Sequence, residues 1–189
     1  MIHFDPIIEP LNFEDLCRRP GLAYLHNNPD CQRPPKYWTP FKTILADGFN
    51  NLCAYTVIYE PVGTVDHFIS IKQDRNLAYD WANYRYASQW INSCKKHYNV
   101  LDPFAVVDGW FEIILPSLQL VLTNQVPPEH REIAESTLKR LHLRDDERVI
   151  RSRLEWYRMY QEGELNLEGL RRKAPLIARA VDKQLAAQL

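Results

Sequence analysis

The chain has 189 residues, which is enough for one good-sized hydrophobic core or for a small catalytic core with extensions. Its 46% hydrophobic content, with five Trp and ten Tyr, excludes a disordered protein. The net charge of −1 provides no overall attraction to nucleic acid, so binding to DNA would require a local basic patch.

The sequence also predicts the cellular location of the protein. Its N-terminus has neither the basic start nor the apolar run of a signal peptide, and no stretch reaches the about 18–20 continuous apolar residues of a membrane span. The cysteines are scattered and form no C-x-x-C pair, which favours reduced thiols. We therefore expect a cytoplasmic protein that does not bind a membrane.

Residues 1–49 are expected to form an irregular and partly helical segment. The first 40 residues are rich in proline and hold several turn signals. A short helix is predicted over 12–17, with Asn12 as its cap. A second helix is predicted over 38–49, where apolar residues recur at helical spacing.

Residues 50–105 are expected to form the central unit of the protein. β-Branched and aromatic residues over 53–59 and 64–68 flank a short segment with Pro and Gly, which predicts a β-hairpin. A loop or short helical turn is expected over 76–82, and a helix over 84–96. The predicted order is therefore a hairpin followed by a helix.

Residues 106–189 are expected to form a strand followed by a helical extension. The segment 110–122 has strand-like residues and is interrupted by Pro116. Asp145 is a candidate helix cap, and Pro175 suits the first turns of a helix. Helices are predicted over 129–141, 145–161 and 171–189.

One set of polar residues stands out in the central unit. Asp66 and His67 are adjacent, and Asn83 and Asn92 follow at increasing distance along the chain. An imidazole near its ordinary pKa can take a proton from water at neutral pH. A carboxylate and a carboxamide supply the hard oxygen ligands that Mg²⁺ and Mn²⁺ prefer. Such a set can hold one divalent cation beside one general base.

In order and spacing, these residues resemble the signature of the HNH endonucleases, which runs Asp-His, then Asn, then Asn or His. The resemblance covers about residues 50–100 and implies an α+β fold. Its ββα-metal core, a β-hairpin plus a helix, would lie between N-terminal and C-terminal helical extensions. The resemblance implies that His67 is the general base, that Asp66 and Asn92 bind one Mg²⁺ or Mn²⁺ ion, and that Asn83 orients the loop and the base.

Basic side chains near the motif are expected to contact phosphates. Lys95 and Lys96 follow the last motif residue, where HNH proteins often carry basic side chains, and Arg85 is expected to contact phosphates from the preceding turn. The expected activity is metal-dependent hydrolysis of DNA phosphodiester bonds. By analogy with small HNH proteins, the resemblance implies a nuclease effector of a bacterial defence system, with an ATPase or another regulatory subunit as its partner.

Many HNH proteins of this type hold a structural zinc ion between two C-x-x-C knuckles. The corresponding positions here are Cys53 to Thr56 and Ser88 to Ile91, so Cys53 is the one cysteine left. Zinc in a structural site needs four donors, and we therefore expect no structural zinc. An aromatic cluster is expected to hold the hairpin to the helix instead: Tyr55, Phe68, Trp81, Tyr84 and Trp90.

Two other interpretations of the motif remain open. In the first, Asp66 and His67 form a structural hydrogen bond while Asn83 and Asn92 cap helices. In the second, the chain is a catalytically inactive HNH-fold module that binds nucleic acid or a protein partner.

His97 is close enough in sequence to Asn92 to reach the same site.

Overall fold

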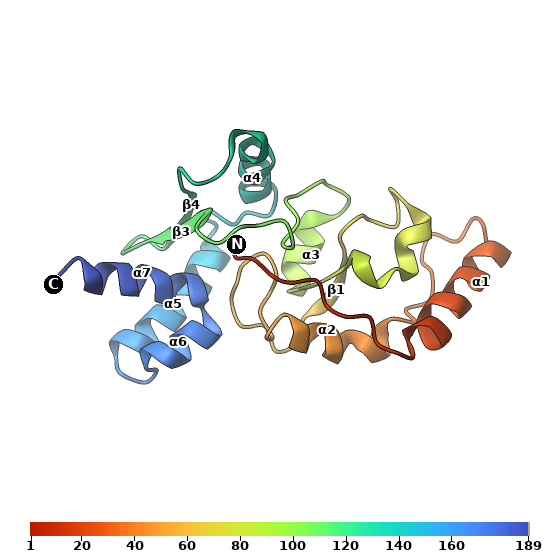
Figure 1. The fold of residues 1–189 in the computed structure, drawn as a ribbon, viewed down its shortest axis with the longest axis horizontal. Coiled ribbons are helices and arrows are strands. Elements are labelled where there is room, and N and C mark those ends of the chain that lie inside the picture. Colours follow the sequence, from red (N-terminus) through yellow and green to blue (C-terminus); the bar gives the residue numbers. More distant parts are fainter. Residues whose placement is uncertain (189) are drawn as a thin grey trace.

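The computed structural model describes residues 1–188 and combines seven α-helices with two antiparallel sheets of two strands each. The expected α+β class is therefore confirmed. In Figure 1 the molecule is elongated: the first helices lie at one end, the last helices at the other, and the first hairpin lies between them. Within the described residues, no helix is long and apolar enough to cross a membrane.

The N-terminal segment is more helical than its sequence predicts. A π-helical turn at Glu14–Arg18 runs directly into α1 (Arg19–Asn27), and Asn12 does not cap it. The second predicted helix is a 3-10 turn at Thr39–Phe41 that continues into α2 (Lys42–Gly48).

The central unit contains a hairpin and a helix, but the strand partners differ from the prediction. β1 (Thr64–His67) pairs antiparallel with β2 (Tyr84–Ala87), and α3 (Gln89–Lys95) follows at once. The segment 53–59 is a turn that is closed by one bridge between Leu52 and Tyr59. The predicted pairing of 53–59 with 64–68 is therefore wrong.

The predicted helix over 84–96 is also too long. Residues 84–87 are all buried and pair with β1, so tertiary packing overrides their local pattern. The Ser88 side chain accepts the Ile91 N–H and starts α3 one residue later. The connection over 68–83 holds two 3-10 turns, Arg75–Tyr79 and Trp81–Asn83, in agreement with the turn expected over 76–82.

The C-terminal part begins with a second hairpin. β3 (Phe111–Ile114) pairs antiparallel with β4 (Gln119–Leu122), where a single interrupted strand was expected. Four helices follow. The residue that caps the second of them, α5 (Glu147–Gln161), is Asp146 and not the predicted Asp145. The last predicted helix is divided before Pro175, because Ala174 leaves the helical conformation, which is disfavoured for a residue that precedes a proline. Leu189 lies outside the described residues. The helices are α4 (Pro128–Arg140), α5 (Glu147–Gln161), α6 (Leu167–Lys173) and α7 (Pro175–Ala186).

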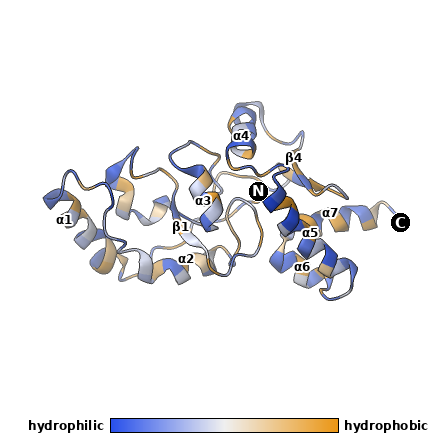
Figure 2. Ribbon diagram, turned by 180° about the vertical axis from the view of Figure 1, so that it is seen from behind, coloured by the Kyte–Doolittle hydropathy of each residue, from blue (hydrophilic) through white to orange (hydrophobic). Residues whose placement is uncertain are grey.

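One hydrophobic core takes residues from all three predicted segments, among them Phe13, Tyr84 and Leu138. The helices labelled in Figure 2 carry both hydrophilic and hydrophobic residues, as expected for helices with one buried face. The central turn is also tied to the C-terminal helices: the Tyr59 N–H donates to the Lys173 carbonyl (2.8 Å), and the Lys173 ammonium lies 3.1 Å from the centre of the Tyr59 ring.

Candidate catalytic site

Three of the four motif residues meet at one cavity. Asp66 and His67 end β1, Asn92 lies on α3, and all three line a cavity of about 360 Å³. Asn83, at the end of the long connection, does not line it. The other lining residues are Ser70, Ile71, Lys72, Lys96 and His97.

Asp66 is 1% exposed, and both of its carboxylate oxygens accept hydrogen bonds. The Tyr55 hydroxyl donates to Oδ2 (2.6 Å), and the Lys95 ammonium donates to Oδ1 (3.1 Å). A buried carboxylate is costly unless it is paired and hydrogen-bonded, and these two partners provide that compensation. The position and direction of the carboxylate are thereby fixed.

Lys95 is fully buried, which contradicts its predicted contact with phosphate. Besides the bond to Asp66, its ammonium donates to the carbonyl oxygens of His67 (2.7 Å) and Phe68 (2.8 Å). An ammonium has three N–H donors, so all of them are in use. Lys95 therefore joins α3 to the end of β1 and is not free to bind a phosphate.

Arg85 is also a structural residue and not the phosphate contact expected from the sequence. Its guanidinium is buried and forms a bidentate ion pair with Asp102 (2.8 and 2.7 Å), and it lies 3.7 Å from the centre of the Phe104 ring. Its remaining terminal nitrogen donates to the carbonyls of Ala82 and Tyr84. These contacts hold β2 against the segment that follows α3.

His67 is half-buried, and its contacts select one tautomer. Its Nε2 lies 2.9 Å from the Ala78 carbonyl oxygen, which can only accept, so Nε2 carries the proton. Nδ1 then keeps its lone pair. The ring packs against Trp38 (4.6 Å between ring centres) and Tyr84 (5.1 Å), and the Tyr84 hydroxyl also donates to the Ala78 carbonyl.

Burial lowers the pKa of His67 below its ordinary value of 6.5, because a charged imidazolium loses solvation there. The hydrogen bond to the Ala78 carbonyl opposes this change without reversing it. The lowered pKa keeps His67 neutral at pH 7. A neutral imidazole with one free nitrogen is the form that a general base requires.

Asn83 fixes the loop that precedes β2. Its Oδ1 accepts the Ile69 N–H (2.8 Å), and its Nδ2 donates to the carbonyls of Ile69 (2.9 Å) and Leu77 (3.1 Å). The side chain therefore joins both ends of the segment that leads to Ala78. This geometry suits the loop-orienting role implied by the resemblance.

Asn92 donates through Nδ2 to the Val65 carbonyl (3.2 Å), while its Oδ1 accepts no hydrogen bond from residues 1–188. That oxygen and the Asp66 carboxylate belong to one cavity, so the donor set suits a hard cation that keeps most of its water ligands. Residues 1–188 contain no group of three or more His, Cys, Asp or Glu able to hold a metal. The fit is thus limited to two protein residues, with the Lys95 ammonium as a competing positive charge.

The hydrogen bonds of the motif differ from those expected in the structural interpretation. Asp66 bonds to Tyr55 and Lys95, not to His67, and His67 bonds to Ala78. Neither asparagine acts as a helix cap, and Ser88 caps α3 instead.

The positions at which many HNH proteins carry zinc knuckles are occupied here by residues with other contacts. Cys53 and Ile91 are buried in the hydrophobic core, and Ser88 caps α3. The expected aromatic cluster is only partly correct, because Trp81 and Tyr84 are the one pair of its members that pack ring against ring (5.9 Å). The other three have separate partners: Tyr55 bonds to Asp66, Phe68 lies under Arg85, and Trp90 packs on His142.

The rim of the cavity is basic. Lys72, Lys96 and His97 are exposed and line it, so Lys96 is accessible in the way that a phosphate contact requires. Sequence reasoning missed Lys72, which lies inside the long connection and outside the motif. It also missed Tyr55, since nothing in its neighbourhood along the chain points to Asp66.

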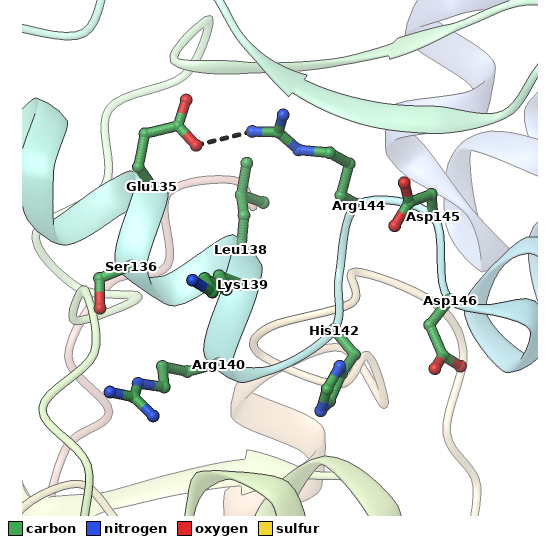
Figure 3. A pocket seen from close by; sticks show the side chains of 9 residues that line it. All are labelled: Glu135, Ser136, Leu138, Lys139, Arg140, His142, Arg144, Asp145 and Asp146. Carbon is green, nitrogen blue, oxygen red and sulfur yellow. Dashed lines mark hydrogen bonds and ion pairs between the residues drawn. The ribbon is translucent and has the colours of Figure 1, made fainter.

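A larger cavity of about 840 Å³ lies where α4 connects to α5, and Figure 3 shows its lining. Its charged side chains are of both signs, and three of them make contacts within the fold: Arg144 pairs with Glu135 (2.6 Å), and Asp146 accepts the Arg148 N–H that starts α5. None of the motif residues lines this cavity, and its mixed charge favours no single class of ligand.

Comparison with protein-family models, with curated proteins and with solved structures gave no match for this chain.

Proposed function

We propose that the protein is a metal-dependent endonuclease of the HNH type, which hydrolyses DNA phosphodiester bonds at the Asp66–His67–Asn92 cavity. The observation that carries the proposal is the fixed tautomer of His67, with a base nitrogen left free beside a carboxylate and a carboxamide in one cavity. Such groups match the needs of phosphodiester hydrolysis, which are a base for water and oxygen ligands for a cation.

His67 takes a proton from the attacking water at Nδ1. The Ala78 carbonyl, which accepts a hydrogen bond from the Nε2–H, then stabilises the positive charge that forms on the ring. Asn83 holds the segment that carries Ala78, and so it orients the base without touching the substrate.

The oxygens of Asp66 and Asn92 would hold a Mg²⁺ or Mn²⁺ ion. When bound, this ion supplies Lewis-acid stabilisation of the charge on the phosphate. The exposed amines of Lys72 and Lys96 attract the nucleic-acid backbone to the rim of the cavity. A role in bacterial defence, an ATPase partner and a cytoplasmic location complete the proposal, on analogy with small HNH proteins.

Cleavage of supercoiled plasmid in Mg²⁺, Mn²⁺ or EDTA tests this proposal. We expect cleavage that needs the metal, and a loss of rate of about 10²–10⁴-fold in His67→Ala, the usual contribution of a general base. His130→Ala is the matched control, because His130 packs on Trp110 and does not line the cavity, and it should keep the wild-type rate. Identical product patterns for the wild type and His67→Ala at every metal would overturn the proposal.

A second candidate function is a non-catalytic module on the same fold that binds nucleic acid. The ion pair between Lys95 and Asp66 favours it, because it already satisfies an oxygen that a metal ligand would offer. Retained binding to plasmid DNA with no cleavage in either metal would select this second function.

A further inference from the structure

Lys95 stands out because a fully buried ammonium lies against the carboxylate of a proposed metal ligand. Three oxygens surround its Nζ: Asp66 Oδ1 at 3.1 Å, the His67 carbonyl at 2.7 Å and the Phe68 carbonyl at 2.8 Å. Both charges are almost completely removed from water, since the side chains of Lys95 and Asp66 are 0% and 2% exposed. A buried positive charge is therefore in direct contact with the carboxylate that lines the cavity.

Without a metal, the named residues around the cavity already carry no net negative charge. The Lys95 ammonium compensates the Asp66 carboxylate, Asn92 is neutral, and the exposed side chains of Lys72 and Lys96 are positive. A divalent cation that approaches Asp66 and Asn92 thus meets no net negative charge from these residues. A phosphate of a bound nucleic acid would add the missing negative charge at this place.

We propose that Lys95 is a positioning residue that makes divalent-cation binding depend on nucleic acid. Its ammonium holds the buried carboxylate in place while no metal is bound, and it weakens the attraction of the cavity for a free metal ion. The metal ion and the DNA then bind together, each increasing the affinity for the other, as linkage requires. This inference rests on the proposed function, because it assigns the control of metal binding at the same site.

Titration of Mn²⁺ by calorimetry and by electron paramagnetic resonance tests the inference. All proteins carry His67→Ala, so that a short duplex DNA stays intact during the measurement. We expect the duplex to raise the Mn²⁺ affinity of this reference protein by at least about tenfold, because phosphate charge is added in a poorly screened cavity. The same duplex with a protein that also carries Asp66→Asn gives the baseline for Mn²⁺ bound by DNA alone.

Lys95→Met is the decisive variant. Removal of the ammonium should raise the affinity for Mn²⁺ without DNA by at least about tenfold and should reduce the effect of DNA. Tyr55→Phe is the comparison variant, because it removes the other hydrogen bond to Asp66 without a change of charge, and it should not raise the affinity for Mn²⁺ as Lys95→Met does. Lys95→Gln keeps N–H donors without the charge and replaces Lys95→Met if that variant fails to fold.

Thermal unfolding gives a second readout. Lys95→Met leaves the Asp66 carboxylate buried without its ion pair, so we expect a lower Tm that Mn²⁺ partly restores, while Mn²⁺ has little effect on the reference protein.

The outcomes separate the two proposals. If Asp66→Asn binds Mn²⁺ as the reference protein does, with and without DNA, there is no metal site at Asp66, and the proposed function fails together with this inference. If Mn²⁺ binds at Asp66 but DNA does not change its affinity, the inference alone is overturned, even if both Lys95 variants unfold. Equal affinities in the folded Lys95→Met and Tyr55→Phe variants overturn it as well.

Discussion

The two hairpins of this molecule have strands of equal length and the same antiparallel pairing, yet they bury different groups. In β3–β4, each strand presents both buried and exposed residues. In β1–β2, the second strand is buried at every position. The connections differ as well: residues 115–118 close the second hairpin, whereas residues 68–83 separate the strands of the first.

The difference is greatest for polar side chains. Five of the seven buried polar or charged residues of the described chain belong to the first hairpin, its connection or the helix after it: Asp66, Ser70, Asn83, Arg85 and Lys95. Such groups are costly to bury, and a hairpin that only supports the fold does not need them. The first hairpin therefore buries and pairs most of the polar side chains, whereas the second is held mainly by apolar packing.

Removal of an ion pair should show the largest difference between the two hairpins in the loss of unfolding free energy. Arg85→Met leaves Asp102 without its partner, and we expect the free energy of unfolding to fall by about 3 kcal/mol, at the lower end for buried pairs because the Asp102 side chain is 25% exposed. Lys183→Met removes the pair with Glu112 on β3, where Lys183 is 75% exposed, and should cost less than about 1 kcal/mol. Urea unfolding measures both, and equal losses would refute the comparison.

Substitution of the residues that fix the two connections should show a smaller difference in the loss of unfolding free energy. Asn83→Ala removes three hydrogen bonds and deprives the half-buried backbone N–H and carbonyl of Ile69 of these partners, at a cost of about 2 kcal/mol. Ser117→Ala removes two exposed hydrogen bonds, one to the Ile114 carbonyl and a long one from the Gln119 N–H (3.5 Å), and should cost less than about 0.5 kcal/mol. Hydrogen exchange at the Ile69 amide should rise in Asn83→Ala, and unchanged protection would contradict the role assigned to Asn83.

The smallest expected effect is the pH dependence that His67 gives to the first hairpin. Its folded-state pKa is lowered by burial, so the unfolded chain takes up a proton at a higher pH than the folded protein does. The contribution of His67 to stability is complete above pH 6.5 and is lost as the pH falls through the lowered folded pKa.

His67→Gln should therefore lose less stability than the wild type when the pH falls below 6.5. By the same reasoning, the acidic midpoint of kcat/KM for cleavage should lie below pH 6.5. Urea unfolding and plasmid cleavage at a series of pH values check these expectations, and an acidic midpoint above 6.5 would show that another group controls the rate.

Local pattern in the sequence was enough to predict several elements. The segment around Asp66 and His67 is a strand, the helices α4 and α5 begin and end close to their predicted bounds, and the chain is α+β. These features depend on residues near one another along the chain, whose periodicity and caps are visible in the sequence.

Features that depend on distant partners were not predictable in this way. Tyr84 to Ala87 has residues that suit a helix or a strand, and only pairing with β1 decides between them. Lys95 and Lys96 are adjacent and have the same chemistry, yet one is fully buried and the other exposed, because only Lys95 faces Asp66 across the structure. A basic side chain is therefore weak evidence for a nucleic-acid contact until its burial is known.

The hydrogen bond and the cation–π contact between Tyr59 and Lys173 limit which fragments of this protein can keep the site intact. Residues 50–105 hold the whole motif, but a fragment that ended there would lose the helix that covers Tyr59. Tyr59 belongs to the same short turn as Tyr55, whose hydroxyl fixes Asp66. The smallest fragment that keeps the carboxylate in its native position is therefore expected to extend through α6, about eighty residues beyond Asn92.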